Sequence, residues 1–332
     1  EEDFSKKFGS SSPAIAVGSG TDALHLSYML ANLEPGDEVI APVFTCTATN
    51  IPFLYMGVKI NFADIDPETM NIDVSHVRQL MNQNVKAIVC VHYGGLPCDM
   101  DELQLIADEW GVPIIEDAAH AVGAKYKGVN VGSISDFTMF SFQAIKHITT
   151  GDGGMLIIKN KDLVDKAERI RWFGIDRKSK QAGIWENDIT EIGYKYQMTD
   201  IAAAMGIASL SEFDEQSKLR KELFETYEAE LADCDLLKVV GGGFSDREHA
   251  AWLFTVLVED RYTLQQKLRD NGIESNQVHF RNDRYSIFNE FTEGKSFPNM
   301  DKLEDNYLVL PLHTKMSKDD VIRVCKVIKS GW

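Results

Sequence analysis

The sequence predicts an α/β protein: a large domain around a mostly parallel sheet, followed by a smaller α+β domain. Two observations carry this prediction. Over the first two-thirds of the 332 residues, short β-branched runs alternate with amphipathic segments, which is typical of parallel strands covered on both faces. After about Ser217 the order changes to strands and helices of a different spacing. Since domains average about 150 residues, we expect two, 1–216 and 217–332.

The expected elements follow one another in regular order. We expect strands at Ala14–Val17, Glu38–Pro42, Val58–Ala63, Val85–Val91, Val112–Ile115, Phe137–Phe142 and Met155–Ile158. Helices are expected to about Leu33 after the Gly18 turn, and at Thr47–Tyr55, Met100–Trp110, Asp162–Phe173 and Asp200–Leu231. In the small domain we expect strands at Leu236–Val240, Ala251–Val258 and Ile273–Val278, and helices at Arg261–Asn271 and Lys318–Ile328.

Charge and cysteine content limit the function. The net charge of −17 disfavours binding to nucleic acid or to an anionic membrane, so an anionic ligand needs a local cluster of donors. The five cysteines form no C-x-x-C pair and are odd in number, which indicates a reduced, cytoplasmic protein. The sequence contains no recognisable signal peptide, membrane-spanning run or metal-binding motif, and we expect no metal.

A glycine-rich turn, Gly18-Ser19-Gly20-Thr21-Asp22, lies between a strand and a helix. Backbone N–H groups at a helix N-terminus favour a phosphate group. The spacing also fits the dinucleotide fingerprint, but that fold places an acid after its second strand, whereas Asp37 and Glu38 come before it. We favour a monophosphate site, with a dinucleotide site or a plain tight turn as alternatives.

Two further strand ends carry reactive side chains. Val112–Ile115 leads to Glu116 and Asp117, which face either a ligand or solvent. Phe137–Phe142 contains Ser141 and is followed by Lys146. A lysine near an apolar strand end is either a nucleophile activated by desolvation or a surface lysine that reaches solvent.

The three features together match the contacts of pyridoxal 5′-phosphate (PLP). A lysine forms an imine with the cofactor, a carboxylate keeps the pyridine nitrogen protonated, and a cradle holds the phosphate.

The chain resembles the DegT/DnrJ/EryC1/StrS family of sugar aminotransferases along nearly its whole length. The strongest segments are SGTDALHL from Ser19, PGDEVIAPVFT from Pro35, DIDPETMNID from Asp64, KAIVCVHYGGLPCDMD from Lys86, VPIIEDAAHAVGAKYKG from Val112 and SFQAIKHITTGDGGML from Ser141. The resemblance implies PLP fold type I, with a mostly parallel seven-stranded sheet, a small C-terminal α+β domain, and a homodimer with shared active sites.

Carried over by position, the resemblance makes Lys146 the Schiff-base lysine and proton carrier, and Asp117 the partner of the pyridine nitrogen. It places His120 beside the phenolic oxygen of the cofactor. It also implies that Gly20, Thr21 and Ser141 bind the phosphate.

Two positions depart from the family pattern. Cys46 stands where an aromatic residue usually stacks on the cofactor ring, so either Cys46 or Phe44 packs there. Lys195 replaces the asparagine that reaches the phosphate of the partner subunit, and we expect it to keep that role.

Four residues of the small domain are expected near the substrate. The resemblance places His279, Arg281 and Arg284 close to it, where the arginines either grip a diphosphate or form salt bridges with Asp283 and its neighbours. His313 lies in another family-like segment, with a substrate-binding or a structural role.

The resemblance implies amino transfer from L-glutamate to the C3 or C4 ketone of a nucleotide-linked keto-deoxysugar, for amino-sugar or polysaccharide biosynthesis. One alternative is a nucleotide-sugar dehydratase, although that branch replaces the lysine that is present here as Lys146. A second alternative is a non-catalytic regulatory protein that keeps the PLP fold.

Overall fold

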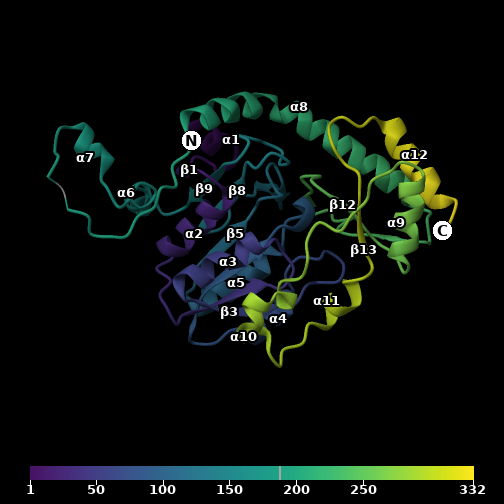
Figure 1. The fold of residues 1–332 in the computed structure, drawn as a ribbon, viewed down its shortest axis with the longest axis horizontal. Helices are drawn as coiled ribbons and strands as arrows, with labels where there is room; N and C mark the ends of the chain where they lie inside the picture. The colour runs from purple at the N-terminus through teal and green to yellow at the C-terminus, as the bar shows by residue number, and fades with distance from the viewer. Residues whose placement is uncertain (187) are drawn as a thin grey trace.

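The computed structural model describes residues 1–186 and 188–332. Its centre is a seven-stranded sheet in the order β1-β9-β8-β5-β4-β2-β3 (Figure 1). The strands of this sheet are β1 (Ala14–Val17), β2 (Glu38–Pro42), β3 (Lys59–Ala63), β4 (Val85–Val91), β5 (Ile114–Asp117), β8 (Phe137–Ser141) and β9 (Gly154–Ile158). The β8, β5, β4, β2 and β3 strands are parallel neighbours, and β9 pairs antiparallel with both β8 and β1. The predicted mostly parallel seven-stranded sheet is confirmed.

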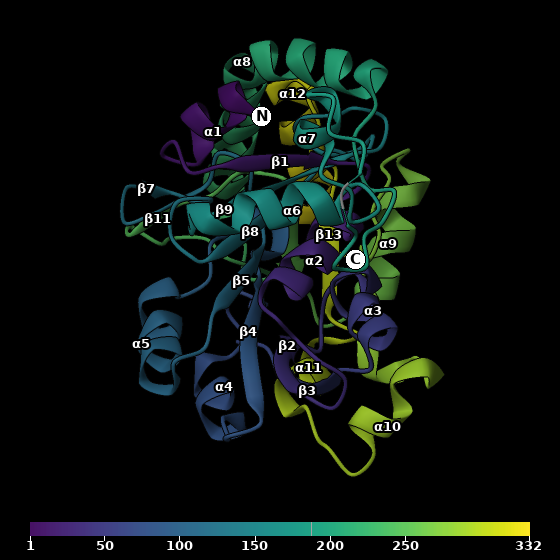
Figure 2. The ribbon, with the colours of Figure 1, turned by 90° about the vertical axis from the view of Figure 1, so that its left-hand side faces the viewer.

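Helices cover both faces of this sheet (Figure 2). One face packs against α2 (Gly20–Leu30), α3 (Thr47–Met56) and α6 (Val164–Ile170). The other packs against α4 (Val74–Leu80) and α5 (Met100–Trp110) and, beside β8 and β9, against α1 (Glu2–Phe8). This burial on both faces explains the continuous apolar strands of the sequence.

The long helix α8 (Asp200–Leu231) runs from the large sheet to the C-terminal part of the chain (Figure 1). Phe213 packs beneath the large sheet, whereas Leu223 and Tyr227 pack against the second core. That core contains the sheet β10-β12-β13, made of β10 (Lys238–Val239), β12 (Phe254–Leu257) and β13 (Tyr307–Leu310), together with α9 (Arg261–Asp270) and α12 (Lys318–Lys329). The packing passes from one core to the other within α8, and a boundary at 216/217 stays a prediction.

The remaining elements are short. A third sheet joins β6 (Lys125–Tyr126), β7 (Val129–Asn130) and β11 (Arg247–Glu248). The short helices are η1 (Tyr93–Gly95), η2 (Lys161–Leu163), α7 (Arg177–Gln181), η3 (Asn282–Arg284), η4 (Ser286–Phe288), α10 (Asn289–Thr292) and α11 (Pro298–Leu303). Phe288, Phe291 and Met300 return to the core of the large sheet, so the segment around them belongs structurally to the first domain.

Two predicted elements are wrong. The helix expected to reach Phe173 ends at Ile170, because Phe173 adopts a left-handed conformation (φ 58°) that a helix does not continue through. The strand expected at Ile273–Val278 makes only a single bridge, between Asn276 and Val309. Among the described residues, no helix is long and apolar enough to cross a membrane.

Candidate functional site

Lys146 lies in the loop that follows β8, with its amine 3.7 Å from the centre of the Trp252 ring. Within the described residues this amine makes no hydrogen bond or ion pair. Burial lowers the pKa of Lys146 to about 8, against the opposing attraction of Asp117 and Cys46. An amine with such a pKa is partly uncharged near neutral pH and can act as a nucleophile.

Asp117 ends β5, 4% exposed, and two donors hold its carboxylate. The Thr49 hydroxyl donates to Oδ2 at 2.7 Å, and the Ala119 N–H donates to Oδ1 at 3.1 Å. Burial raises the pKa of Asp117, while these two hydrogen bonds and the charge of Lys146 oppose the rise. The sequence analysis missed Thr49, because no motif marks a hydroxyl on a helix that crosses beside the strand end.

His120 lies in a group of aromatic rings next to Lys146. Its ring stacks on Trp252 at 3.7 Å between centroids and lies parallel to His279 at 5.3 Å. Its Nδ1 accepts the Gly94 N–H at 3.3 Å, which leaves the ring hydrogen on Nε2. Burial lowers the pKa of His120 well below its usual range, so the ring is a neutral donor. Trp252 was also missed, since it lies within an ordinary apolar run.

The N-terminus of α2 meets the end of β8. A methyl group added at Gly20 would lie 3.0 Å from the Ser141 Cβ atom, so the two residues are direct neighbours. Ser19 caps the helix by accepting the Asp22 N–H at 3.0 Å. The N–H groups of Gly20 and Thr21 belong to the first turn, where no intrahelical acceptor exists, and the positive helix end favours an anion there.

The structure distinguishes between Phe44 and Cys46 as the residue that packs on the cofactor ring. Phe44 is 1% exposed and packs against Tyr93 and Tyr307, with 5.2 Å between ring centroids in each case. Cys46 is exposed, directly precedes α3, and contributes to the electrostatic environment of Lys146. The geometry therefore favours Cys46 on the cofactor side.

Arg281 does not fit the predicted diphosphate contact. Its side chain is 2% exposed, and its donors are bound by the carboxylates of Asp283 (2.7 Å), Asp301 (2.6 Å) and Glu304 (2.9 Å). The half-exposed Arg284 also pairs with Glu304, at 3.1 Å. The structure thus supports the salt-bridge interpretation for both arginines, because phosphate would have to displace carboxylates already in place.

His313 and Lys146 line the same cavity of about 710 Å³, whose wall also includes Trp252 and Arg220. Lys195 lies elsewhere in this chain, in the segment before α8, and its amine sits 3.7 Å from the centre of the Trp172 ring. The α7 helix and the segments beside it project away from the sheet (Figure 1). Lys195 is bridged to Trp172, just after α6, and lies outside the described wall of the lysine cavity.

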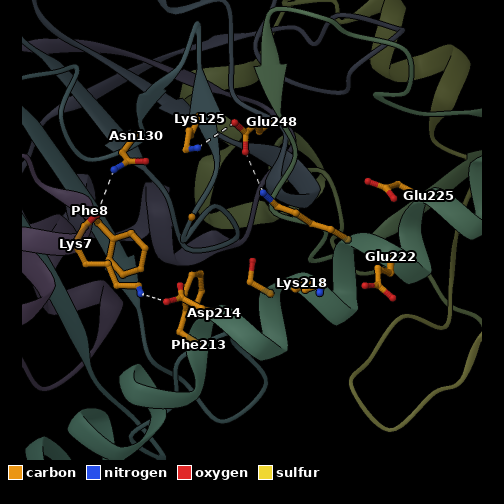
Figure 3. A pocket seen from close by; sticks show the side chains of 13 residues that line it. Lys7, Phe8, Lys125, Asn130, Phe213, Asp214, Lys218, Glu222, Glu225 and Glu248 are labelled. Carbon is orange, nitrogen blue, oxygen red and sulfur yellow. Dashed lines mark hydrogen bonds and ion pairs between the residues drawn. The ribbon is translucent and has the colours of Figure 1, made fainter.

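A second cavity, of about 570 Å³, opens between α1, α8 and the β6 and β11 strands (Figure 3). Several of its charges are paired: Lys7 with Asp214 at 2.6 Å, and Glu248 with both Lys125 and Lys221. Its described lining contains none of the predicted site residues, whereas Lys146 and His313 line the other cavity. The cavity at Lys146 is therefore the candidate entrance to the active site.

The groups around Lys146 fit PLP. The unpaired amine suits an aldehyde, the held carboxylate of Asp117 suits a pyridine nitrogen, and the N–H of His120 suits a phenolic oxygen. The Nε2 atom of His279 is buried without a hydrogen-bond partner among the described residues, as expected of a site built to receive a polar ligand. Fold and site together define a PLP-dependent transferase of fold type I.

The chain belongs to the DegT/DnrJ/EryC1/StrS aminotransferase family, whose model matches residues 1–329. It is 33% identical to GDP-perosamine synthase of Escherichia coli O157:H7, over 96% of this chain and 85% of that protein. The crystal structure of the sugar aminotransferase CalS13 from Micromonospora echinospora superposes with a TM-score of 0.91 at 32% identity, covering 96% of this chain and 87% of the other.

The PLP form of a putative sugar aminotransferase, Spr1654 from Streptococcus pneumoniae, superposes with a TM-score of 0.90 at 28% identity, over 99% of this chain and 89% of the other. The protein is a PLP-dependent sugar aminotransferase. The sequence-based alternative of a non-catalytic regulatory protein is not supported.

Proposed function

We propose that the enzyme moves an amino group from L-glutamate to the C3 or C4 ketone of a nucleotide-linked keto-deoxysugar, for amino-sugar or polysaccharide biosynthesis. The observation that carries the proposal is the amine of Lys146, which has no hydrogen bond or ion pair among the described residues and is close enough to Asp117 for each to shift the pKa of the other. When bound, PLP supplies an aldehyde and a ring that accepts electrons.

Each predicted side chain then has one task. Lys146 would hold PLP covalently, and its free amine would carry a proton between the substrate carbon and C4′ of the cofactor. Asp117 keeps the pyridine nitrogen protonated, and His120 donates its Nε2 hydrogen to the phenolic oxygen. The N–H groups of Gly20 and Thr21, with the Ser141 hydroxyl, bind the phosphate.

The homodimer is supported by apolar side chains at the surface. Ile201 and Ile207, at the start of α8, are 78% and 65% exposed, and Ile192 beside them in sequence is 79% exposed. Large apolar side chains that stay exposed are candidates for protein–protein contacts. We propose that this surface binds a second copy of the chain, and that Lys195 reaches the phosphate in the partner's site.

Two residues remain as substrate contacts after the arginines are set aside. His313 is exposed in the cavity that contains Lys146, and His279 lies beside His120 with its Nε2 unpartnered among the described residues. The similarity to a GDP-perosamine synthase supports a nucleotide-linked substrate. The five cysteines, all free, support a cytoplasmic location.

The test is amination of defined acceptors. Enzyme converted to its amine form with L-glutamate and freed of glutamate is mixed with GDP- and dTDP-linked 3-keto- and 4-keto-6-deoxyhexoses. We expect one of them to yield an amino sugar nucleotide by mass spectrometry, with return of the PLP absorbance. Turnover with 2-oxo acids alone would contradict the sugar assignment, and loss of water from the sugar without amination would favour the dehydratase alternative.

A further inference from the structure

A second group of reactive side chains lies on the face of the sheet opposite Asp117. Cys90 is in β4, His92 directly follows that strand, and Cys98 precedes α5. Their side chains are 0%, 0% and 1% exposed, and the two sulfur atoms and one ring nitrogen lie within 4.8 Å of one another. The proposed aminotransferase mechanism uses none of them.

The ring of His92 is held in one orientation. Its Nδ1 accepts the Cys98 N–H at 3.1 Å, so the ring hydrogen is on Nε2 and is donated to Glu116 at 2.7 Å. Glu116 is fixed in turn by the Ser135 N–H and the Thr138 hydroxyl on its other oxygen. A histidine that binds a metal commonly donates its other N–H to a carboxylate in this way, which orients the ring for the ion. A bound ion would replace the Cys98 N–H as the partner of Nδ1.

We propose that Cys90, His92 and Cys98 form a zinc site. Two thiolates and one imidazole match the ligand preference of Zn²⁺, and the two thiolates balance its charge in the buried core. Tetrahedral zinc with such ligands places donor atoms about 3.5 to 4 Å apart, so small side-chain rotations suffice. The Val91 carbonyl oxygen, which accepts the Cys98 S–H at 3.2 Å, is the candidate fourth ligand.

The proposed zinc site lies on the other face of the sheet from the catalytic centre, and it would affect stability and not the reaction. The sheet register pairs Cys90 with Glu116 and Val91 with Asp117, so the metal would lie on one face of the sheet and the cofactor on the other. A zinc ion here would stabilise the junction of β4, β5 and α5 without contacting the reacting atoms. Because both cysteines must lose protons to bind it, zinc affinity is expected to fall as the pH is lowered.

The test is the metal content of the PLP-loaded enzyme. Reduced protein is incubated with excess Zn²⁺, freed of unbound metal, and analysed by elemental mass spectrometry, with Cys90→Val and Cys98→Ser beside a matched control, Cys234→Ala. We expect one tightly held zinc ion per chain in wild type and in Cys234→Ala, and its loss in the two site variants. Retained PLP absorbance and L-glutamate reactivity check that the variants are folded.

A second measurement uses the wild type alone, so its result does not depend on whether the variants fold. Co²⁺ in place of Zn²⁺ should give the intense absorption of a thiolate-bound tetrahedral ion. The proposal is overturned if reduced wild type holds no zinc and no such cobalt spectrum develops. It is equally overturned if Cys90→Val and Cys98→Ser keep the metal, or if the thiols are recovered as a Cys90–Cys98 disulfide that forms in preference to metal binding.

Discussion

Glu116 and Asp117 are neighbours in the chain but serve different faces of the sheet. Successive side chains of a strand point to opposite faces, so Asp117 meets Thr49 while Glu116 meets His92. The apolar run before them could not distinguish the two carboxylates, because both simply follow it; only the family resemblance pointed to Asp117.

This separation makes a matched pair of variants. Asp117→Asn should retain cofactor but lower kcat by orders of magnitude, because an amide cannot keep the pyridine nitrogen protonated. Glu116→Gln changes the adjacent residue equally conservatively, and it should lower the melting temperature while kcat stays within a few-fold of wild type. Steady-state kinetics and thermal unfolding of both proteins check this. Equal losses of kcat in the two variants would contradict the assignment.

The pKa of Lys146 predicts how fast the apoprotein captures PLP. Only the uncharged amine attacks the aldehyde, so the capture rate should rise about tenfold per pH unit below pH 8 and level off above it. Stopped-flow absorbance measures the rate, and Lys146→Ala is the control for non-covalent binding. A rate that keeps rising toward pH 10.5, the ordinary lysine value, would show that burial does not perturb this amine.

The lowered pKa of Lys146 also makes the stability of the apoprotein depend on pH. Because the folded chain releases the Lys146 proton near pH 8 and the unfolded chain near 10.5, the unfolded chain binds more protons between these values. The contribution of Lys146 to the stability of the apoprotein therefore rises with pH across this window.

At the scale of elements, α3 supports the end of β5 through a single hydroxyl. Thr49→Val keeps the side-chain shape but removes the hydrogen bond that lowers the pKa of Asp117. The acid limb of kcat/KM should move upward by about one pH unit, since hydrogen bonds to charged groups contribute roughly 1.5 kcal/mol or more. Thr226→Val, which removes a hydroxyl bonded to a backbone carbonyl within α8, is the control. An unmoved acid limb would exclude the positioning role of Thr49.

The strands of the large sheet and the helix Asp200–Leu231 were predictable because their periodicity and length are strong signals. Contacts between distant segments were not. Trp252 meets His120 only through folding, and the three acids that pair with Arg281 include Asp301 and Glu304, some twenty residues further along the chain. From sequence alone, the two arginines therefore predicted an anionic partner, but not whether that partner is a ligand phosphate or a carboxylate of the protein itself.

At the scale of the whole molecule, the proposed dimer explains why apolar residues remain exposed on α8. Replacing Ile201 and Ile207 together with glutamate should yield monomers in light scattering, because charges buried across an interface are costly. The monomeric variant should also bind PLP more weakly, because Lys195 would no longer reach the phosphate in a partner's site. Leu105→Glu, at a 57% exposed position on α5, is the control. A double variant that stays dimeric would place the interface elsewhere.

The central claim is that Lys146 and Asp117 form a PLP site that accepts the amino group of L-glutamate. The most direct test is the visible absorption spectrum of the protein with PLP, before and after L-glutamate is added, for wild type and for Lys146→Ala. The account predicts a yellow band in wild type that glutamate bleaches, and no such covalent band in a folded Lys146→Ala. A wild-type spectrum that glutamate leaves unchanged would contradict the assigned donor, and the same band and bleaching in Lys146→Ala would contradict the assigned lysine.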